Sequence, residues 1–221
     1  LSSVTSDGYI DRASSDLKSA YLSGSYVGTN NIFKAVILLG DEKTYQAWYG
    51  IPKDSLRTNR KFNPAGEMYD ADGNFLGYYD NQTDNYTQNY YQLHYAHKFS
   101  DKISVTTSGF LTTGKGYYES YKNGEDYSDY GIKDTMIGNH NVNMTNLISQ
   151  KWLDNKFYGI NLTMNYTAEN LTLNFGGGWN QYDGDHYGKI IWAQVIPLDW
   201  LNHNWYFNTG KKTDINIFAK A

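Results

Sequence analysis

Residues 157–180 show the clearest pattern of hydrophobic and polar positions in the chain. Every second residue from Tyr158 to Tyr166 is apolar or aromatic, and the positions between them are glycine, asparagine or threonine. The same alternation resumes from Leu171 to Trp179 after a short turn. A period of two residues is typical of a β-strand with one apolar face. The segment therefore predicts a hairpin of two antiparallel strands.

The apolar face of this predicted hairpin is aliphatic in the middle and aromatic toward its ends. Its side chains are Tyr158, Ile160, Leu162, Met164, Tyr166, Leu171, Leu173, Phe175 and Trp179. One such strand, tilted near 40°, would rise about 20 Å, which approximates the lipid-facing apolar band of an outer-membrane barrel with its aromatic girdles. A soluble β-sandwich would show the same alternation with this face as its core. The hairpin alone leaves both interpretations open.

Alternation along the rest of the chain predicts about seven strands in all. They are expected near 17–28, 32–40, 86–99, 103–113, 158–166, 171–179 and 213–221. Tight turns join the first strand to the second, the third to the fourth and the fifth to the sixth, and the long segments 41–85, 114–156 and 181–212 lie between these pairs. We expect the long segments at one rim and the tight turns at the other, as in barrels with long extracellular loops and short periplasmic turns.

Composition narrows the class of protein further. The chain has 221 residues, 22 Tyr, no Cys and a net charge of −4, and no apolar run approaches the roughly 20 residues of a spanning helix, so only strands could carry it across a membrane. The absence of cysteine excludes a disulfide framework and thiol chemistry. The mildly acidic balance argues against a nucleic-acid surface. Because the first residue is Leu1 and no signal peptide is present, we expect a piece of a longer chain.

Motifs for metal binding or catalysis are weak. Asp70, Asp72 and Asn74 surround Gly73, but the spacing does not fit a calcium loop and favours a hairpin turn. His94 and His97 are three residues apart, which places them on opposite faces of a strand. No nucleophile triad, phosphate loop or glycosidase acid pair stands out, so the sequence predicts no enzyme, no cofactor and no metal site.

Two segments concentrate residues suited to ligand capture, and both are expected in long loops. Tyrosine offers a stacking face and a hydroxyl at small entropic cost, and the segment around 183–186 adds carboxylates and an imidazole. The candidates are Tyr117, Tyr118, Tyr121, Tyr182, Asp183, Asp185 and His186. Packing of these rings on one another as a lid is an equally open interpretation.

Four runs of residues resemble the barrel portion of TonB-dependent outer-membrane receptors. They are Ser6–Leu17, Thr44–Pro52, Asp80–Tyr86 and Gln150–Gly159. The resemblance extends over nearly the whole chain and implies part of a transmembrane barrel of about 22 strands with an N-terminal plug. It also implies import of a scarce nutrient such as an iron chelate, cobalamin or an oligosaccharide across the outer membrane of a Gram-negative bacterium. The implied partners are that ligand, the lipid bilayer, and TonB through an N-terminal part absent here.

The chain departs from that family in what it lacks. We expect the plug domain, the TonB box and a terminal strand ending in an aromatic residue to lie outside these residues. We therefore expect residues 1–221 to form a partial barrel domain, a middle third that does not transport by itself. Two alternatives stay open: a soluble β-sandwich binding module such as a carbohydrate-binding domain, and a secreted all-β hydrolase, which the lack of a convergent acid pair disfavours.

Overall fold

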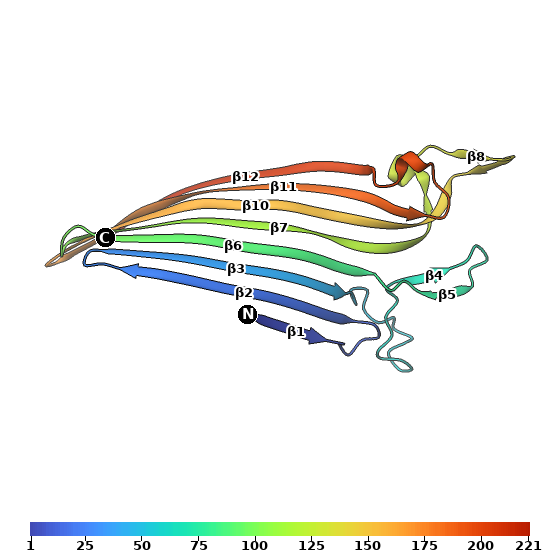
Figure 1. Ribbon diagram of the computed structural model, residues 1–221, viewed down its shortest axis with the longest axis horizontal. Coiled ribbons are helices and arrows are strands. Elements are labelled where there is room, and N and C mark those ends of the chain that lie inside the picture. The colour runs from blue at the N-terminus through green and yellow to red at the C-terminus, as the bar shows by residue number, and fades with distance from the viewer.

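The computed structural model describes the whole chain, residues 1–221, as one open antiparallel sheet with loops at one end. Eight strands cross the sheet in chain order (Figure 1). They are β1 (Ser2–Ser6), β2 (Ser14–Val27), β3 (Asn31–Tyr45), β6 (Thr83–Lys98), β7 (Ile103–Asp126), β10 (Met144–Ala168), β11 (Leu171–Ala193) and β12 (Asn204–Lys220). Two small hairpins stand apart, β4 (Glu67–Tyr69) with β5 (Phe75–Tyr78) and β8 (Thr135–Ile137) with β9 (His140–Val142).

Two short 3-10 helices complete the fold, η1 (Tyr127–Tyr130) and η2 (Leu198–Trp200). Neither has the length or the apolar content needed to cross a membrane.

The connections divide between the two ends of the sheet as predicted. The tight turns β2–β3, β6–β7 and β10–β11 lie at one end, and the segments 46–82, 127–143 and 194–203 lie at the other, where the β4–β5 and β8–β9 hairpins project beyond the sheet (Figure 1). Antiparallel pairing between every pair of neighbours in the main sheet produces this division. The two other sheets are small two-stranded hairpins at the loop end and do not cover a face of the main sheet, so the structure does not support the β-sandwich alternative.

The strands are longer than the sequence predicts, and the loops correspondingly shorter. β7, β10 and β11 have 24, 25 and 23 residues. Together with β12 they take up most of the segments expected as loops at 114–156 and 181–212. Backbone hydrogen bonds continue wherever neighbouring strands pair. Alternation of apolar and polar residues marks only the part of a strand that has an apolar environment on one face. The expected count of seven strands is also wrong, because β1 is short and its polar sequence carries no alternation signal.

Cross-strand register gathers the apolar residues on one face of the sheet. Ile160 lies opposite Trp179, Leu162 opposite Gly177 and Met164 opposite Phe175, and directly paired residues share a face. All nine residues predicted to form an apolar face do so. The pattern continues across the neighbouring strands, where its exposed members include Leu22, Tyr26, Phe33, Tyr91, Leu93, Leu111, Ile215 and Ile217. We call this set the apolar band.

The opposite face of the sheet is polar in the same part of the strands, directly behind the apolar band. Thr163 lies opposite Thr106 and Gly176, and Asn161 lies opposite Ser108 and Gly178. A sheet with one apolar and one polar face needs an apolar partner or environment that covers its apolar face. The apolar band is exposed along nearly its whole width, far beyond the patches that soluble monomers show.

The only buried apolar cluster lies at the loop end, on the polar face. Leu147 and Ile190 come from β10 and β11, and the residues that cover them, with Tyr127 and Tyr130 among them, come from the loop after β7. The Tyr127 hydroxyl donates to the backbone oxygen of Val195 at 2.6 Å. These contacts fix the segments 127–143 and 194–203 over the polar face of the sheet.

A second set of contacts fixes the long segment 46–82. Asn63 is 1% exposed, its amide nitrogen donates to the backbone oxygens of Asp11 at 3.0 Å and Gln46 at 2.9 Å, and its amide oxygen accepts from the backbone nitrogen of Ala65 at 3.0 Å. The Arg12 guanidinium donates to the backbone oxygens of Asn63 and Ala65. The Asn63 side chain thus satisfies three backbone groups from three parts of the chain.

We expect Asn63→Ala to loosen this segment without unfolding the sheet. The substitution leaves buried backbone groups without partners, at a cost of roughly 1–3 kcal/mol, and that cost is local because the sheet ladder is untouched. Limited proteolysis of the folded protein should show faster cleavage within 46–82. Asn59→Ala, an exposed site in the same segment, should leave cleavage unchanged, and equal rates in the two variants would contradict the role of Asn63.

Candidate functional site

A cavity of about 480 Å³ lies at the loop end of the polar face. Aromatic and basic side chains dominate its lining, which includes Trp48, Tyr49, Asp84, Tyr86, Tyr118, Lys122, Lys151, Leu153, His186 and Tyr206. We call it the mouth cavity. Its volume is in the range of small-molecule sites, roughly 300–1,000 Å³.

Strand register builds the wall of the mouth cavity. Tyr118 of β7 lies between Asp84 of β6 and Lys151 of β10, so these three side chains form one row on the polar face. The next row on the same face brings Leu153 opposite His186 of β11. Residues that are far apart in sequence meet here because consecutive antiparallel strands pair directly.

The segment after β3 closes one side of the cavity. The Trp48 ring stacks on the Tyr118 ring with centroids 4.9 Å apart and planes at 20°. The Tyr118 hydroxyl accepts from the side-chain nitrogen of Gln82 at 3.2 Å, and the Gln82 oxygen accepts from the backbone nitrogen of Tyr121 at 2.9 Å. Trp48 is 63% exposed, so one face of this stacked pair is available to a ligand.

The floor of the cavity depends on a glycine. The Tyr86 ring lies across Gly116, where a Cβ would come within 2.6 Å of the Tyr86 Cδ2 atom. The Tyr86 hydroxyl accepts from the side-chain nitrogen of Asn155 at 3.0 Å. Tyr86 is therefore held flat against the sheet, which leaves room above it.

The mouth cavity is electropositive. Lys122 and Lys151 outnumber its one carboxylate, Asp84. Burial raises the pKa of Asp84, and burial together with the neighbouring Tyr49 raises the pKa of Tyr118, so the Tyr118 hydroxyl stays neutral and can donate. The Nε2 atom of His186 is buried and has no hydrogen-bond partner. Together these groups suit an anionic ligand with aromatic or otherwise flat surfaces.

Two of the seven predicted ligand residues, Tyr118 and His186, present their side chains at the mouth cavity. Tyr117 borders it, but its ring is on the face of the apolar band and packs at a tilt against the Trp152 ring, with centroids 4.5 Å apart. Tyr121 lies on that same face and stacks with Trp192 at 6.3 Å. Tyr117, Tyr118 and Tyr121 all belong to β7, so their expected position in a loop is wrong.

The predicted cluster at residues 182–186 is likewise part of a strand, β11, and its members divide between the two faces. Tyr182 is on the polar face, below the mouth cavity. Asp183 and Asp185 are on the other face, where Asp183 accepts from the Tyr158 hydroxyl at 3.0 Å and Asp185 from the Thr209 hydroxyl at 2.6 Å. Adjacent residues of a strand point in opposite directions, and this separates a cluster that looks dense in sequence.

The sequence prediction missed most of the cavity. Trp48 and Tyr49 carry a usable signal, because two adjacent aromatic residues follow a strand in a polar segment. Asp84, Lys122 and Lys151 carry no such signal. Their proximity to Tyr118 depends on the register of three strands, which the sequence pattern does not specify.

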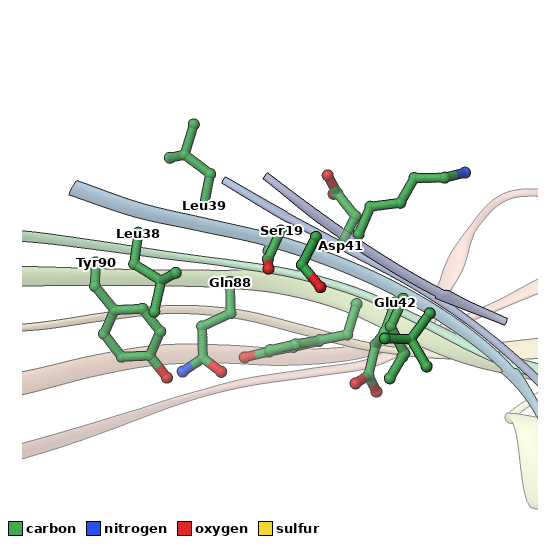
Figure 2. A pocket seen from close by; sticks show the side chains of 13 residues that line it. Ser19, Leu38, Leu39, Asp41, Glu42, Gln88 and Tyr90 are labelled. Carbon is green, nitrogen blue, oxygen red and sulfur yellow. The ribbon is translucent and has the colours of Figure 1, made fainter. Parts of the chain in front are cut away.

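A second hollow, of about 390 Å³, lies toward the β1 edge of the sheet. Figure 2 shows Leu38, Gln88 and Tyr90 on one side of the sheet there and Leu39 on the other. It has no stacked aromatic pair, and Lys18 is its one basic residue beside the carboxylates of Asp41 and Glu42. The mouth cavity is therefore the stronger candidate for binding an anionic ligand.

The motifs set aside in the sequence behave as predicted. Asp70 closes the β4–β5 hairpin, with its carboxylate accepting from the backbone nitrogens of Asp72 and Asn74 at 3.0 and 2.8 Å. Hydrogen bonds from the side chain and backbone of Asn74 lower the pKa of Asp70. His94 and His97 lie on opposite faces of β6.

Solved structures of receptors share the antiparallel fold of this chain over most of its length. The ferric preacinetobactin receptor BauA of Acinetobacter baumannii matches with a TM-score of 0.53 and 11% identity, over 90% of this chain and 26% of that chain. The ferric-catecholate import receptor Fiu of E. coli K12 matches with a TM-score of 0.57 and 15% identity in its closed form, over 96% and 32%. Its open form matches with a TM-score of 0.53 and 12% identity, over 96% and 35%.

The chain thus spans about a quarter to a third of the length of these receptors. No protein-family model and no curated protein sequence matches it. At these identities the likeness concerns the fold: an antiparallel all-β sheet similar to part of the barrel wall of transport receptors.

Proposed function

We propose that this chain is part of the barrel wall of a TonB-dependent outer-membrane receptor that imports a scarce nutrient. The observation that carries the proposal is the exposed apolar band, backed by a polar face with an aromatic and basic cavity at its loop end. In such a barrel the band would face lipid, the polar face would line the lumen, and the loop end would be extracellular. The likeness to three receptor structures supports the same arrangement.

The ligand we propose is an anionic nutrient with flat or aromatic groups, for which an iron chelate is the best fit among the expected classes. Trp48 and Tyr118 would stack on its rings, and Lys122 and Lys151 would offset its charge. Cobalamin and neutral oligosaccharides would gain less binding energy from the two lysines than an anionic chelate would. The plug and the contact with TonB would come from parts of the receptor outside residues 1–221.

The test is nutrient uptake by the full-length receptor in cells that lack other receptors. A Lys122→Gln, Lys151→Gln double variant should lose uptake of a ferric catecholate, with surface expression unchanged. Two results would overturn the proposal. One is equal growth on the iron chelate with and without this receptor, and the other is uptake by the double variant at the wild-type rate.

Charge in the mouth cavity should control affinity in opposite directions. Lys151→Gln is expected to weaken binding of an anionic chelate by roughly tenfold, the loss of one charge-assisted contact. Asp84→Asn should strengthen binding, because it removes the one carboxylate. Titration of the purified full-length receptor with the chelate measures both, and Lys212→Gln on the polar face outside the cavity is the matched control.

The same carboxylate predicts a pH dependence. The pKa of Asp84 is raised in the folded protein, so as the pH falls toward that pKa the carboxylate is protonated earlier than a solvated one would be. Affinity for an anion should therefore rise on mild acidification. Asp84→Asn should flatten this part of the profile, and an unchanged profile would contradict the role of Asp84.

A further inference from the structure

A buried carboxylate lies at the loop end of the sheet, on the face opposite the mouth cavity. Glu119 of β7 is 3% exposed and takes part in none of the ion pairs. Its Oε1 atom accepts from the Tyr79 hydroxyl at 2.5 Å and from the Asn81 side-chain nitrogen at 2.6 Å. Its Oε2 atom accepts from the side-chain nitrogen of Gln150 at 2.6 Å. Both carboxylate oxygens are needed as acceptors here, which an amide could not supply.

These contacts attach the end of the segment 46–82 to the sheet. Burial and the Glu119 carboxylate raise the pKa of Tyr79, so the Tyr79 hydroxyl stays protonated and continues to donate. The next residue after Asn81 is Gln82, which is 2% exposed. Glu119 therefore fixes the part of the chain from which the Gln82 side chain extends.

Gln82 connects this attachment to the stacked aromatic pair of the mouth cavity. Its side-chain nitrogen donates to the Tyr118 hydroxyl at 3.2 Å. Its backbone oxygen accepts from the backbone nitrogen of Gln46 at 3.4 Å, two residues before Trp48. Glu119 is next to Tyr118 in β7 and points to the opposite face of the sheet. The route from Glu119 to the cavity therefore passes through Gln82.

We propose that Glu119 is a positioning residue for ligand binding in the mouth cavity and acts from the opposite face of the sheet. By holding the end of the segment 46–82 it sets the position of Gln82, and Gln82 in turn orders the Trp48 and Tyr118 rings. Rings that are ordered before binding cost the ligand less conformational entropy. This inference rests on the proposed function, because it takes the mouth cavity as the binding site of the nutrient.

The hydrogen-bond pattern allows a test by exchange of partners. Glu119→Gln places one amide nitrogen against that of Gln150, and Gln150 is held in its orientation because its oxygen accepts from the Trp152 Nε1 atom at 2.9 Å. Addition of Gln150→Glu restores the pattern, since position 150 then accepts from both sides. The single variant of the purified full-length receptor should bind a ferric catecholate about tenfold more weakly, and the exchange variant should bind within about twofold of wild type.

A second background separates positioning from a general loss of stability. If Glu119 acts through the stacked pair, Glu119→Gln should change affinity by less than about twofold in a receptor that already carries Trp48→Ala and Tyr118→Ala. Tyr79→Phe removes one donor to Glu119 and should also weaken binding in the wild-type background alone. Its matched control is Tyr95→Phe, which removes a hydrogen-bonding hydroxyl at the turn end of the sheet and should leave affinity unchanged.

Three results would overturn the inference: wild-type affinity in Glu119→Gln, an equal loss of affinity in both backgrounds, or an exchange variant that binds as weakly as the single variant. If Glu119→Gln does not fold, Tyr79→Phe in the same two backgrounds decides by the same criteria. The proposed function would survive these results if the Lys122→Gln, Lys151→Gln double variant still loses uptake. A wild-type receptor that does not bind the chelate would overturn both.

Discussion

Leu162→Arg should destabilise the full-length protein in a membrane by about 2–4 kcal/mol, whereas Thr163→Arg should cost far less. The two residues are neighbours on β10 and point to opposite faces. Leu162 is 49% exposed near the middle of the apolar band, where a guanidinium would enter hydrocarbon. At Thr163 the guanidinium would point into the space beside the polar face.

The measurement is the free energy of unfolding from lipid vesicles, by denaturant titration with tryptophan fluorescence. Leu162→Ala is the control, because it removes the apolar area of the leucine without adding a charge. Equal tolerance of arginine at both sites would show that the apolar band does not face lipid. Such a result would leave the fold intact but would require another apolar partner for this face.

The alternation of residues predicted the faces of the sheet better than it predicted the ends of its strands. From Tyr158 to Tyr166 each side chain lies on the face expected, because a period of two fixes the side of every residue once one is known. Beyond this stretch, Asp154 and Lys156 share a face with Ile160, yet their polarity hides the strand. Apolar alternation reports the environment of a strand, and the strand continues where that environment ends.

For the mouth cavity, the sequence pattern could identify single residues but not their neighbours. Tyr118 could be selected from composition, since tyrosines in a polar segment suit ligand capture. Its partners Asp84 and Lys151 could not, because each comes from a different strand and a shift of one residue in register would turn it to the other face. The separation of Asp183 from His186 has the same origin. Proximity in sequence within a strand is a poor guide to a shared site.

Simultaneous replacement of Trp48 and Tyr118 by alanine should weaken nutrient uptake by one decade or more. The two rings form the stacked pair at the mouth cavity, and aromatic contacts are worth about 1 kcal/mol each beyond burial, with further loss from the Tyr118 hydroxyl. Concentration-dependent uptake of a ferric catecholate by cells with the full-length receptor measures the effect. Surface expression must be equal, because Tyr118 also contacts Gln82.

The matched control is the double variant Tyr117→Ala, Tyr121→Ala. Both tyrosines are on β7 close to Tyr118, but their rings pack on the other face, against Trp152 and Trp192. Their loss should affect stability and leave the affinity for the nutrient within about twofold, a change of roughly 0.4 kcal/mol. If both double variants lower affinity equally, the aromatic residues act by holding the sheet together. If only the control lowers it, ligand capture occurs on the face of the apolar band, and the mouth cavity is not the binding site.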